Sequence, residues 1–172
     1  FRFIGYGFVA IIAVAVLSWL WLKSTAATAS DFQDFKRGDI IFQTSTSSQS
    51  LAILLASKSR FSHMGIVDVD SNGRMVVLEA TSTTRETPLM DWVNRGAGGR
   101  IAVYRLPNLS ELDAKSIAAA GRIHFGKPYD LFFYSSEDEL YCSEFVHLAF
   151  KVGAAIDLGE FQKIGTLNLD NF

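Results

Sequence analysis

The hydrophobic and polar positions divide the chain into an apolar leader and a mixed domain. Residues 3–22 form an uncharged, apolar stretch of 20 residues. At about 1.5 Å per residue, a helix of that length spans the roughly 30 Å hydrocarbon core of a bilayer. Residues 24–34 are mostly small or polar and show no hydrophobic period, which is typical of a linker. The pattern predicts a transmembrane anchor or signal segment over residues 1–23, a linker over 24–34 and one domain over 35–172.

The leader has two interpretations. Ala27-Thr28-Ala29 fits the small-residue pattern of a signal-peptidase site, although the apolar stretch exceeds the usual core of about 7–15 residues. Its length therefore favours an uncleaved anchor. A helix that is apolar on every face also needs more surroundings than a domain of this size offers, which disfavours a buried core helix. Either interpretation makes the protein membrane-anchored or exported, with its domain on the periplasmic or extracytoplasmic side.

The remaining pattern predicts a small α+β domain with an antiparallel sheet and packed helices. Period-two and period-3.6 spacing indicate strands at 40–42, 61–69, 74–80 and 100–106, a helix at 51–56, a helical turn at 88–94, a helix from 110 to 126, and a last helix that carries Cys142 and ends at Gly153.

Composition excludes several function classes. A formal charge of −2 leaves no basic stripe for nucleic acid, so no nucleic-acid partner is expected. The single cysteine excludes an intramolecular disulfide, and the three histidines are scattered without the spacing of a zinc site. We therefore predict that the domain needs no metal or other cofactor.

The lone thiol of Cys142 directs attention to a possible base. A thiol becomes nucleophilic when an imidazole takes its proton and a helix N-terminus stabilises the thiolate. His147 lies about 140° round the same helix and points away from the thiol. His124 follows the preceding helix, and its imidazole is expected either to have a hydrogen-bond partner or to face solvent. His63 lies in a strand beside Gly65, which leaves space above the sheet. It is the preferred base.

Six motifs in a fixed order resemble the YiiX/YebB branch of the NlpC-type, papain-like cysteine hydrolases. They are Gly38-Asp39-Ile40-Ile41-Phe42-Gln43, Ser62-His63-Met64-Gly65-Ile66, Val77-Leu78-Glu79-Ala80, Thr87-Pro88-Leu89, Gly126-Lys127-Pro128-Tyr129-Asp130 and Tyr141-Cys142-Ser143-Glu144-Phe145. The resemblance covers nearly all of residues 35–170. It implies a circularly permuted papain-like domain, in which the histidine strand precedes the cysteine helix.

Carried over by position, the resemblance implies Cys142 as nucleophile, His63 as base and Glu79 as the residue that orients the imidazole. An acid in the otherwise apolar strand of Glu79 is costly unless it is paired, which agrees with that role. Tyr129, Tyr141 and Gln43 are candidates for substrate contacts. Tyr129 also suits a packed turn, and Gln43 is the alternative orienter.

The hairpin register decides whether His63 and Glu79 can meet. If Val69 pairs with Gly73 around a three-residue loop, His63 falls directly opposite Glu79 on one face of the sheet. If Val69 pairs with Arg74 instead, the two side chains lie on opposite faces. We expect the first register.

The start of the last helix is a second open point. Ser136 to Glu139 could form a capping box that starts the helix early, whereas activation by the helix dipole requires a start close to Cys142. We expect the later start, with the acidic residues 137–139 in a loop that would raise the pKa of the thiol.

The predicted function is hydrolysis of an amide bond, in a peptide or cell-wall peptide, through an acyl-enzyme on Cys142. One alternative is an acyltransferase or lipid esterase resembling lecithin:retinol acyltransferase, with an acyl-lipid substrate. The other is a non-catalytic binding module held at the membrane through residues 3–22.

Overall fold

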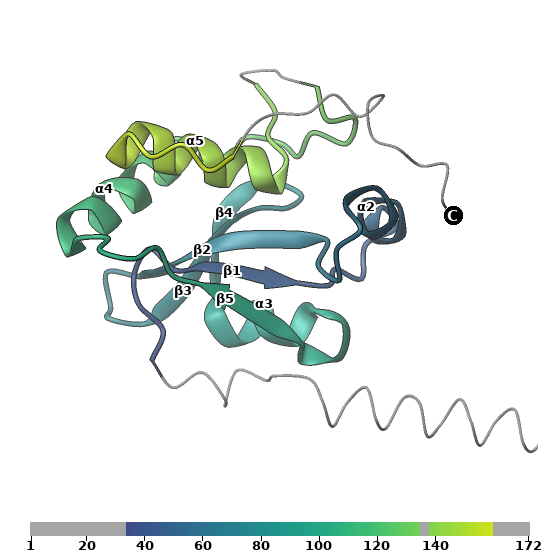
Figure 1. Ribbon diagram of the computed structural model, residues 1–172, viewed down its shortest axis with the longest axis horizontal. Coiled ribbons are helices and arrows are strands. Elements are labelled where there is room, and N and C mark those ends of the chain that lie inside the picture. The colour runs from purple at the N-terminus through teal and green to yellow at the C-terminus, as the bar shows by residue number, and fades with distance from the viewer. Residues whose placement is uncertain (1–33, 135–137, 160–172) are drawn as a thin grey trace, which may run out of the picture.

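A computed structural model describes residues 34–134 and 138–159, which form an α+β domain around one five-stranded sheet (Figure 1). The strand order is β4-β3-β2-β1-β5, and every neighbouring pair is antiparallel. The elements are β1 (Ile40–Gln43), α2 (Ser50–Ser57), β2 (His63–Val69), β3 (Met75–Ala80), β4 (Thr84–Pro88), α3 (Leu89–Arg95), the 3-10 turn η2 (Ala97–Gly99), β5 (Ile101–Tyr104), α4 (Glu111–Arg122) and α5 (Cys142–Ala154).

Helices cover both faces of the sheet because the central strands are apolar on both sides. Alternate residues of β1 and β2, such as Ile40 and Ile66, pack against α4 and α5. Their neighbours Ile41 and Val67 pack against α3, where Trp92 is fully buried. Figure 1 shows α4 and α5 on one side of the sheet and α3 on the other. The α+β prediction is confirmed.

The hairpin of β2 and β3 confirms one part of the register prediction and corrects another. Val69 pairs with Met75, not with Gly73 or Arg74. The carboxylate of Asp70 accepts the backbone N–H groups of Asn72 and Arg74, and Gly73 has φ +79°, so the loop lies at residues 71–73. A shift of two residues preserves the face of each side chain. His63 and Glu79 therefore share a face, but they are diagonal neighbours instead of direct partners.

The last helix begins at Cys142, as predicted, but Gly153 does not end it. The helix continues to Ala154, and Ala155 adopts the left-handed conformation at its end. A Cβ on Gly153 would lie 2.4 Å from the Cα of Ile117 in α4. This glycine therefore permits close packing of two helices, which sequence spacing alone did not distinguish from a helix stop.

Two elements also differ from the sequence pattern. Strand β4 was not predicted, because its sequence Thr-Arg-Glu-Thr-Pro is polar and lacks an apolar alternation. Helix α4 ends at Arg122, before Gly126. Its predicted start is confirmed, since the Ser110 hydroxyl accepts the backbone N–H of Asp113.

The predicted anchor at residues 3–22 lies outside the described residues. Within residues 34–134 and 138–159, no helix has the length and apolar character needed to cross a membrane. The anchor thus stays a prediction.

Candidate functional site

The site forms where the first residue of β2 meets the first turn of α5. His63 opens β2, and Cys142 is the first residue of α5, with Tyr141 in extended conformation before it. The imidazole of His63 lies close enough to the thiol of Cys142 for each group to shift the pKa of the other. A thiol at a helix N-terminus also experiences the positive end of the helix dipole. The fold therefore brings together the two residues that the sequence proposed as nucleophile and base.

Glu79 completes a line of three polar side chains. Its Oε2 lies 2.6 Å from Nε2 of His63, which leaves the other ring nitrogen to face the thiol. Continuing the register of the hairpin, Gly65 lies beside Glu79: a Cβ on Gly65 would be 3.5 Å from the Cβ of Glu79. Because Gly65 has no side chain, the imidazole of His63 can reach the carboxylate of Glu79 diagonally across the hairpin.

Three residues that the sequence did not assign to the site hold Glu79 in place. The indole N–H of Trp92 donates to Oε2 at 2.9 Å, and a guanidinium nitrogen of Arg95 donates to the same oxygen at 2.5 Å. The hydroxyl of Thr87 donates to Oε1 at 2.7 Å. Trp92 also stacks on the imidazole of His63, with ring centroids 5.9 Å apart. The carboxylate is fully buried but amply hydrogen-bonded.

These contacts shift the pKa values of the three groups of the site. Burial alone would raise the pKa of Glu79, but hydrogen bonds from His63 and Arg95 lower it to about 2. Burial would likewise lower the pKa of His63, whereas Cys142 and Glu79 raise it to about 9. The pKa of the Cys142 thiol is lowered, because hydrogen bonding and charge from His63 outweigh burial. The arrangement favours a thiolate–imidazolium pair near neutral pH.

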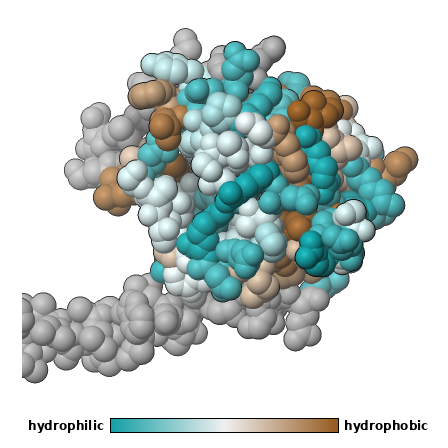
Figure 2. All heavy atoms as spheres, turned by 180° about the vertical axis from the view of Figure 1, so that it is seen from behind, coloured by the Kyte–Doolittle hydropathy of each residue, from teal (hydrophilic) through white to brown (hydrophobic). Residues whose placement is uncertain are grey.

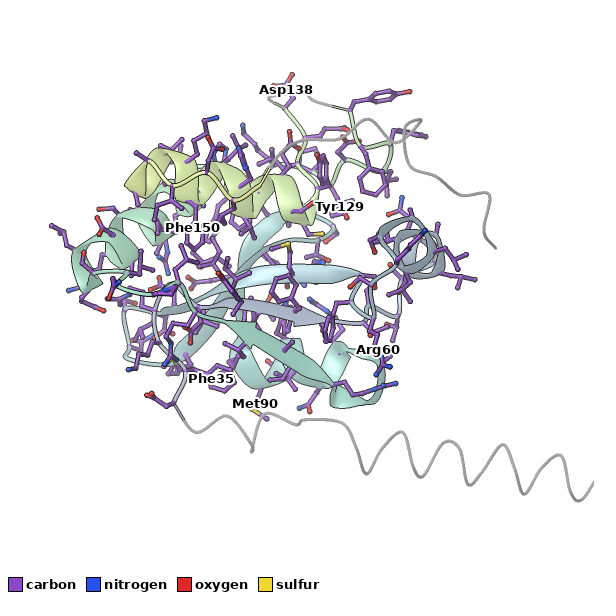
Figure 3. All side chains as sticks on the ribbon, viewed as in Figure 1. Phe35, Arg60, Met90, Tyr129, Asp138 and Phe150 are labelled. Carbon is purple, nitrogen blue, oxygen red and sulfur yellow. The ribbon has the colours of Figure 1, made fainter. Side chains whose placement is uncertain are left out.

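Tyr129 extends from the loop after α4 toward the N-terminal end of α5 (Figure 3). Its hydroxyl donates to Sγ of Cys142 at 3.9 Å. Burial, followed by the negative charge of Cys142, raises the pKa of Tyr129 above its ordinary value. The phenol therefore stays protonated and can donate to the sulfur or to an oxygen that replaces it.

A cleft of about 210 Å³ opens beside His63 and Tyr129. Most of the residues that line it are of polar type, and they come from the serine-rich segment before α2, from α2 itself and from the loop after β3. Arg95 contributes a cation to the wall, while Ile53 and Leu131 contribute apolar surface. The cleft gives a substrate access to the imidazole side of the site.

The other two predicted substrate contacts are placed differently. Gln43 pairs with His63 across β1 and β2, but its side chain is 1% exposed and packs against Gly96, away from the lining of the cleft. Tyr141 caps α5 and its ring lies 5.2 Å from that of Phe133. The structure therefore brings Tyr129 to the cleft, but does not bring Gln43 there.

The remaining histidines and the acidic loop lie away from the thiol chemistry. His147 is 3.5 Å from the carboxylate of Asp157, and His124 follows the end of α4. Asp138 is exposed at the outer part of its loop (Figure 3). The described acidic residues of that loop are not among the main causes that set the pKa of Cys142, which falls because hydrogen bonding and charge from His63 outweigh burial.

Two Escherichia coli proteins are similar to this chain. YiiX of strain K12, described as an uncharacterized protein, is 38% identical over 135 residues, which cover 78% of this chain and 66% of that protein. The chain thus spans just under two thirds of that relative. The crystal structure of YiiX from strain O157:H7, described as a metalloprotein, matches with a TM-score of 0.75 and 39% identity, over 79% of this chain and 76% of the other.

The word metalloprotein raises the question of a metal in this chain. Metal sites of proteins usually combine at least three histidine, cysteine or carboxylate ligands. In the part of the chain that the structure describes, no three such residues are placed to hold an ion. The donor set therefore does not fit a metal there, and we derive no step through one.

A match over most of the domain shows the family to which the chain belongs. The model of the permuted papain-like amidases of the YaeF/YiiX type, the C92 family, matches residues 34–171. The match includes the histidine strand, the carboxylate strand and the cysteine helix in the order of a permuted papain-like fold. The chain belongs to this family of cysteine peptidase/amidase-type hydrolases.

Proposed function

We propose that this protein hydrolyses an amide bond, in a peptide or a cell-wall peptide, through Cys142, His63 and Glu79. The observation that carries the proposal is a buried thiol at a helix start beside an imidazole that is itself hydrogen-bonded to a fully buried carboxylate. A structural cysteine has no need of such an arrangement, whereas a nucleophile requires it.

The first half of the reaction forms a thioester. The thiolate of Cys142 attacks the carbonyl carbon, and the carbonyl oxygen becomes an oxyanion. The backbone N–H of Cys142, which has no partner inside its helix, and the nearby hydroxyl of Tyr129 are the donors available to that oxyanion. The imidazolium of His63 gives its proton to the leaving nitrogen, the C–N bond breaks and the amine departs.

The second half returns the enzyme to its starting state. Neutral His63 takes a proton from water, whose oxygen attacks the thioester carbon, and the C–S bond breaks to release the acid and the thiolate. Glu79 stays ionised throughout and fixes the imidazole orientation, supported by Trp92 and Arg95. No metal enters either half, and independence from cofactors stays a prediction.

An acyl-lipid substrate, or transfer of an acyl group, is the second candidate, because apolar side chains gather beside the cleft. Helix α2 has six apolar residues among its eight, yet none belongs to either core cluster. Leu51 is 66% exposed, and Phe132, which follows the cleft residue Leu131, is 70% exposed. The side chain of Gln49 joins these two walls by donating to the carbonyl of Leu131. The face seen from behind the view of Figure 1 is largely hydrophilic, with scattered apolar side chains (Figure 2).

We infer from the sequence that the domain acts on the extracytoplasmic side, tethered by or released from residues 3–22. A tether would place the cleft near lipid and cell-wall components, where either substrate class is present.

One experiment tests the proposal against its alternatives. The protein is incubated with peptide amides, N-acyl amides and acyl esters, with and without an amine acceptor, and the products and the mass of Cys142 are measured. Hydrolysis predicts a transient acyl adduct on Cys142 and free acid as product, both absent in Cys142→Ala. Acylated acceptor as the main product would favour an acyltransferase. The absence of any adduct on Cys142 would favour a non-catalytic binding module.

A further inference from the structure

Arg95 belongs both to the support of Glu79 and to the wall of the cleft. It is the last residue of α3, and one of its guanidinium nitrogens donates to Oε2 of Glu79 at 2.5 Å. The same residue lines the cleft together with His63 and Tyr129, and its side chain is 34% exposed. Part of the side chain therefore meets the buried carboxylate, and part is open to a molecule in the cleft.

Glu79 does not use all the hydrogen-bonding capacity of Arg95. A guanidinium group offers five N–H donors in a planar fork. Among the described residues, Glu79 is the one that accepts a hydrogen bond from this side chain. Three other side chains also donate to Glu79, so its carboxylate does not depend on Arg95 alone. Donors of Arg95 are therefore left for a ligand.

The residues that line the cleft favour a ligand with one negative charge. None of the described lining residues is an aspartate or a glutamate, and Arg95 is the single lysine or arginine among them. A guanidinium pairs with a carboxylate through two parallel hydrogen bonds. One guanidinium also matches the single charge of a carboxylate better than the nearly two charges of a phosphate monoester. The chemistry of the wall therefore points to a carboxylate.

The contacts of Glu79 indicate where that carboxylate lies relative to the scissile bond. Nε2 of His63 and a nitrogen of Arg95 contact the same oxygen of Glu79, at 2.6 and 2.5 Å. The path from the thiol through the imidazole and this oxygen to the guanidinium is on the order of 10 Å, the length of about three extended residues. His63 protonates the leaving nitrogen, so the part of the substrate on this side is the released amine.

We propose that Arg95 is a specificity-determining residue that binds a carboxylate on the leaving group of the substrate. The preferred substrate is a peptide whose released amine carries a free carboxylate about two to three residues beyond the scissile bond. The guanidinium then bridges this carboxylate and Glu79, which ties the bound substrate to the group that orients the imidazole. This role in turnover rests on the proposed function, whereas binding of a carboxylate does not.

Acetyl-tetra-alanine with a free C-terminal carboxylate, and the same peptide as its carboxamide, form a matched pair of substrates. Wild type should cleave the acid with a kcat/KM about tenfold higher, the scale of a hydrogen bond between charged groups at a partly exposed site. Arg95→Gln should be slower on both peptides, because Glu79 loses a donor, and its acid-to-carboxamide ratio should fall to about one. Arg95→Lys should keep part of the ratio, because lysine retains the charge without the planar fork.

Thr87→Val is the matched control, because Thr87 donates to Glu79 but does not line the cleft. This variant should slow the cleavage of both peptides and leave their ratio as in wild type. Equal kcat/KM for the two peptides in wild type would overturn the proposal. So would a fall of the ratio in Thr87→Val as large as that in Arg95→Gln, since the geometry of Glu79 would then set the preference.

Isothermal titration calorimetry separates the carboxylate site from the proposed function. Cys142→Ala, which lacks the nucleophile, should bind the acid about tenfold more tightly than the carboxamide, and adding Arg95→Gln should remove the difference. If wild type hydrolyses neither peptide but this binding preference is found, the proposed function is contradicted and the carboxylate site stands. Equal affinity of Cys142→Ala for the two peptides would overturn the carboxylate site.

Discussion

Replacing Glu79 with glutamine should lower kcat/KM by about 10³- to 10⁴-fold, because the carboxylate that orients and charges the imidazole is lost. The amide of glutamine also presents a donor to His63, Trp92 and Arg95, which are donors themselves. Removing one partner of a buried ion pair leaves the other uncompensated, so the free energy of unfolding should fall by about 3 kcal/mol. Steady-state kinetics and denaturant unfolding measure the two effects.

The same variant should change the dependence of stability on pH. The pKa of Glu79 lies at about 2 in the folded protein against an ordinary value of 4.5, so its contribution is present above 4.5 and is lost as the pH falls toward 2. Glu79→Gln should lack this loss. Glu86→Gln, an exposed change on the neighbouring strand, is the matched control and should affect neither measurement strongly. Full activity in Glu79→Gln would remove Glu79 from the mechanism.

Gly65→Ala should damage both the fold and the site, although the change adds one methyl group. A Cβ at Gly65 would lie 2.5 Å from Cγ1 of Val77 and 2.7 Å from the carbonyl oxygen of Leu78. The second contact is with backbone, so β2 and β3 must separate, at a cost of about 1–3 kcal/mol. That movement lengthens the diagonal contact of His63 and Glu79, and the acylation rate of Cys142 should fall about 100-fold.

Gly153→Ala separates these two effects. Its Cβ would clash with the backbone of Ile117 at 2.4 Å, which should destabilise the packing of α4 and α5 far along the helix from Cys142. Acylation per folded molecule should be reduced much less than in Gly65→Ala. Equal losses in the two variants would mean that the glycine in β2 serves only the packing of the sheet.

The sequence predicted that Cys142, His63 and Glu79 come together, but it did not predict all of their geometry. Side-chain alternation predicted that His63 and Glu79 share a face, and this is confirmed by their hydrogen bond. The register was off by two residues, because the choice of loop depended on side-chain bonds of Asp70 that spacing does not reveal. A shift of two keeps the face, which is why the error did not separate the pair.

The hydrogen bonds that hold Glu79 could not be predicted from the sequence, for a physical reason. Thr87, Trp92 and Arg95 come from β4 and α3, and neither the polar strand nor the short helix carries a pattern that indicates which face of the sheet it meets. One signal was present: Trp92 and Arg95 are three residues apart, so they share a face of a helix. Only the tertiary structure shows that this face points at a buried carboxylate.

The central claim is that His63 lowers the pKa of the Cys142 thiol and pairs with it. The most direct test is the rate of iodoacetamide alkylation of Cys142 as a function of pH, in wild type and in His63→Ala. The account predicts a wild-type apparent pKa below the free-thiol value of about 8.5, and a higher one in the variant. The same titration in both proteins, at or above the free-thiol value, would contradict it.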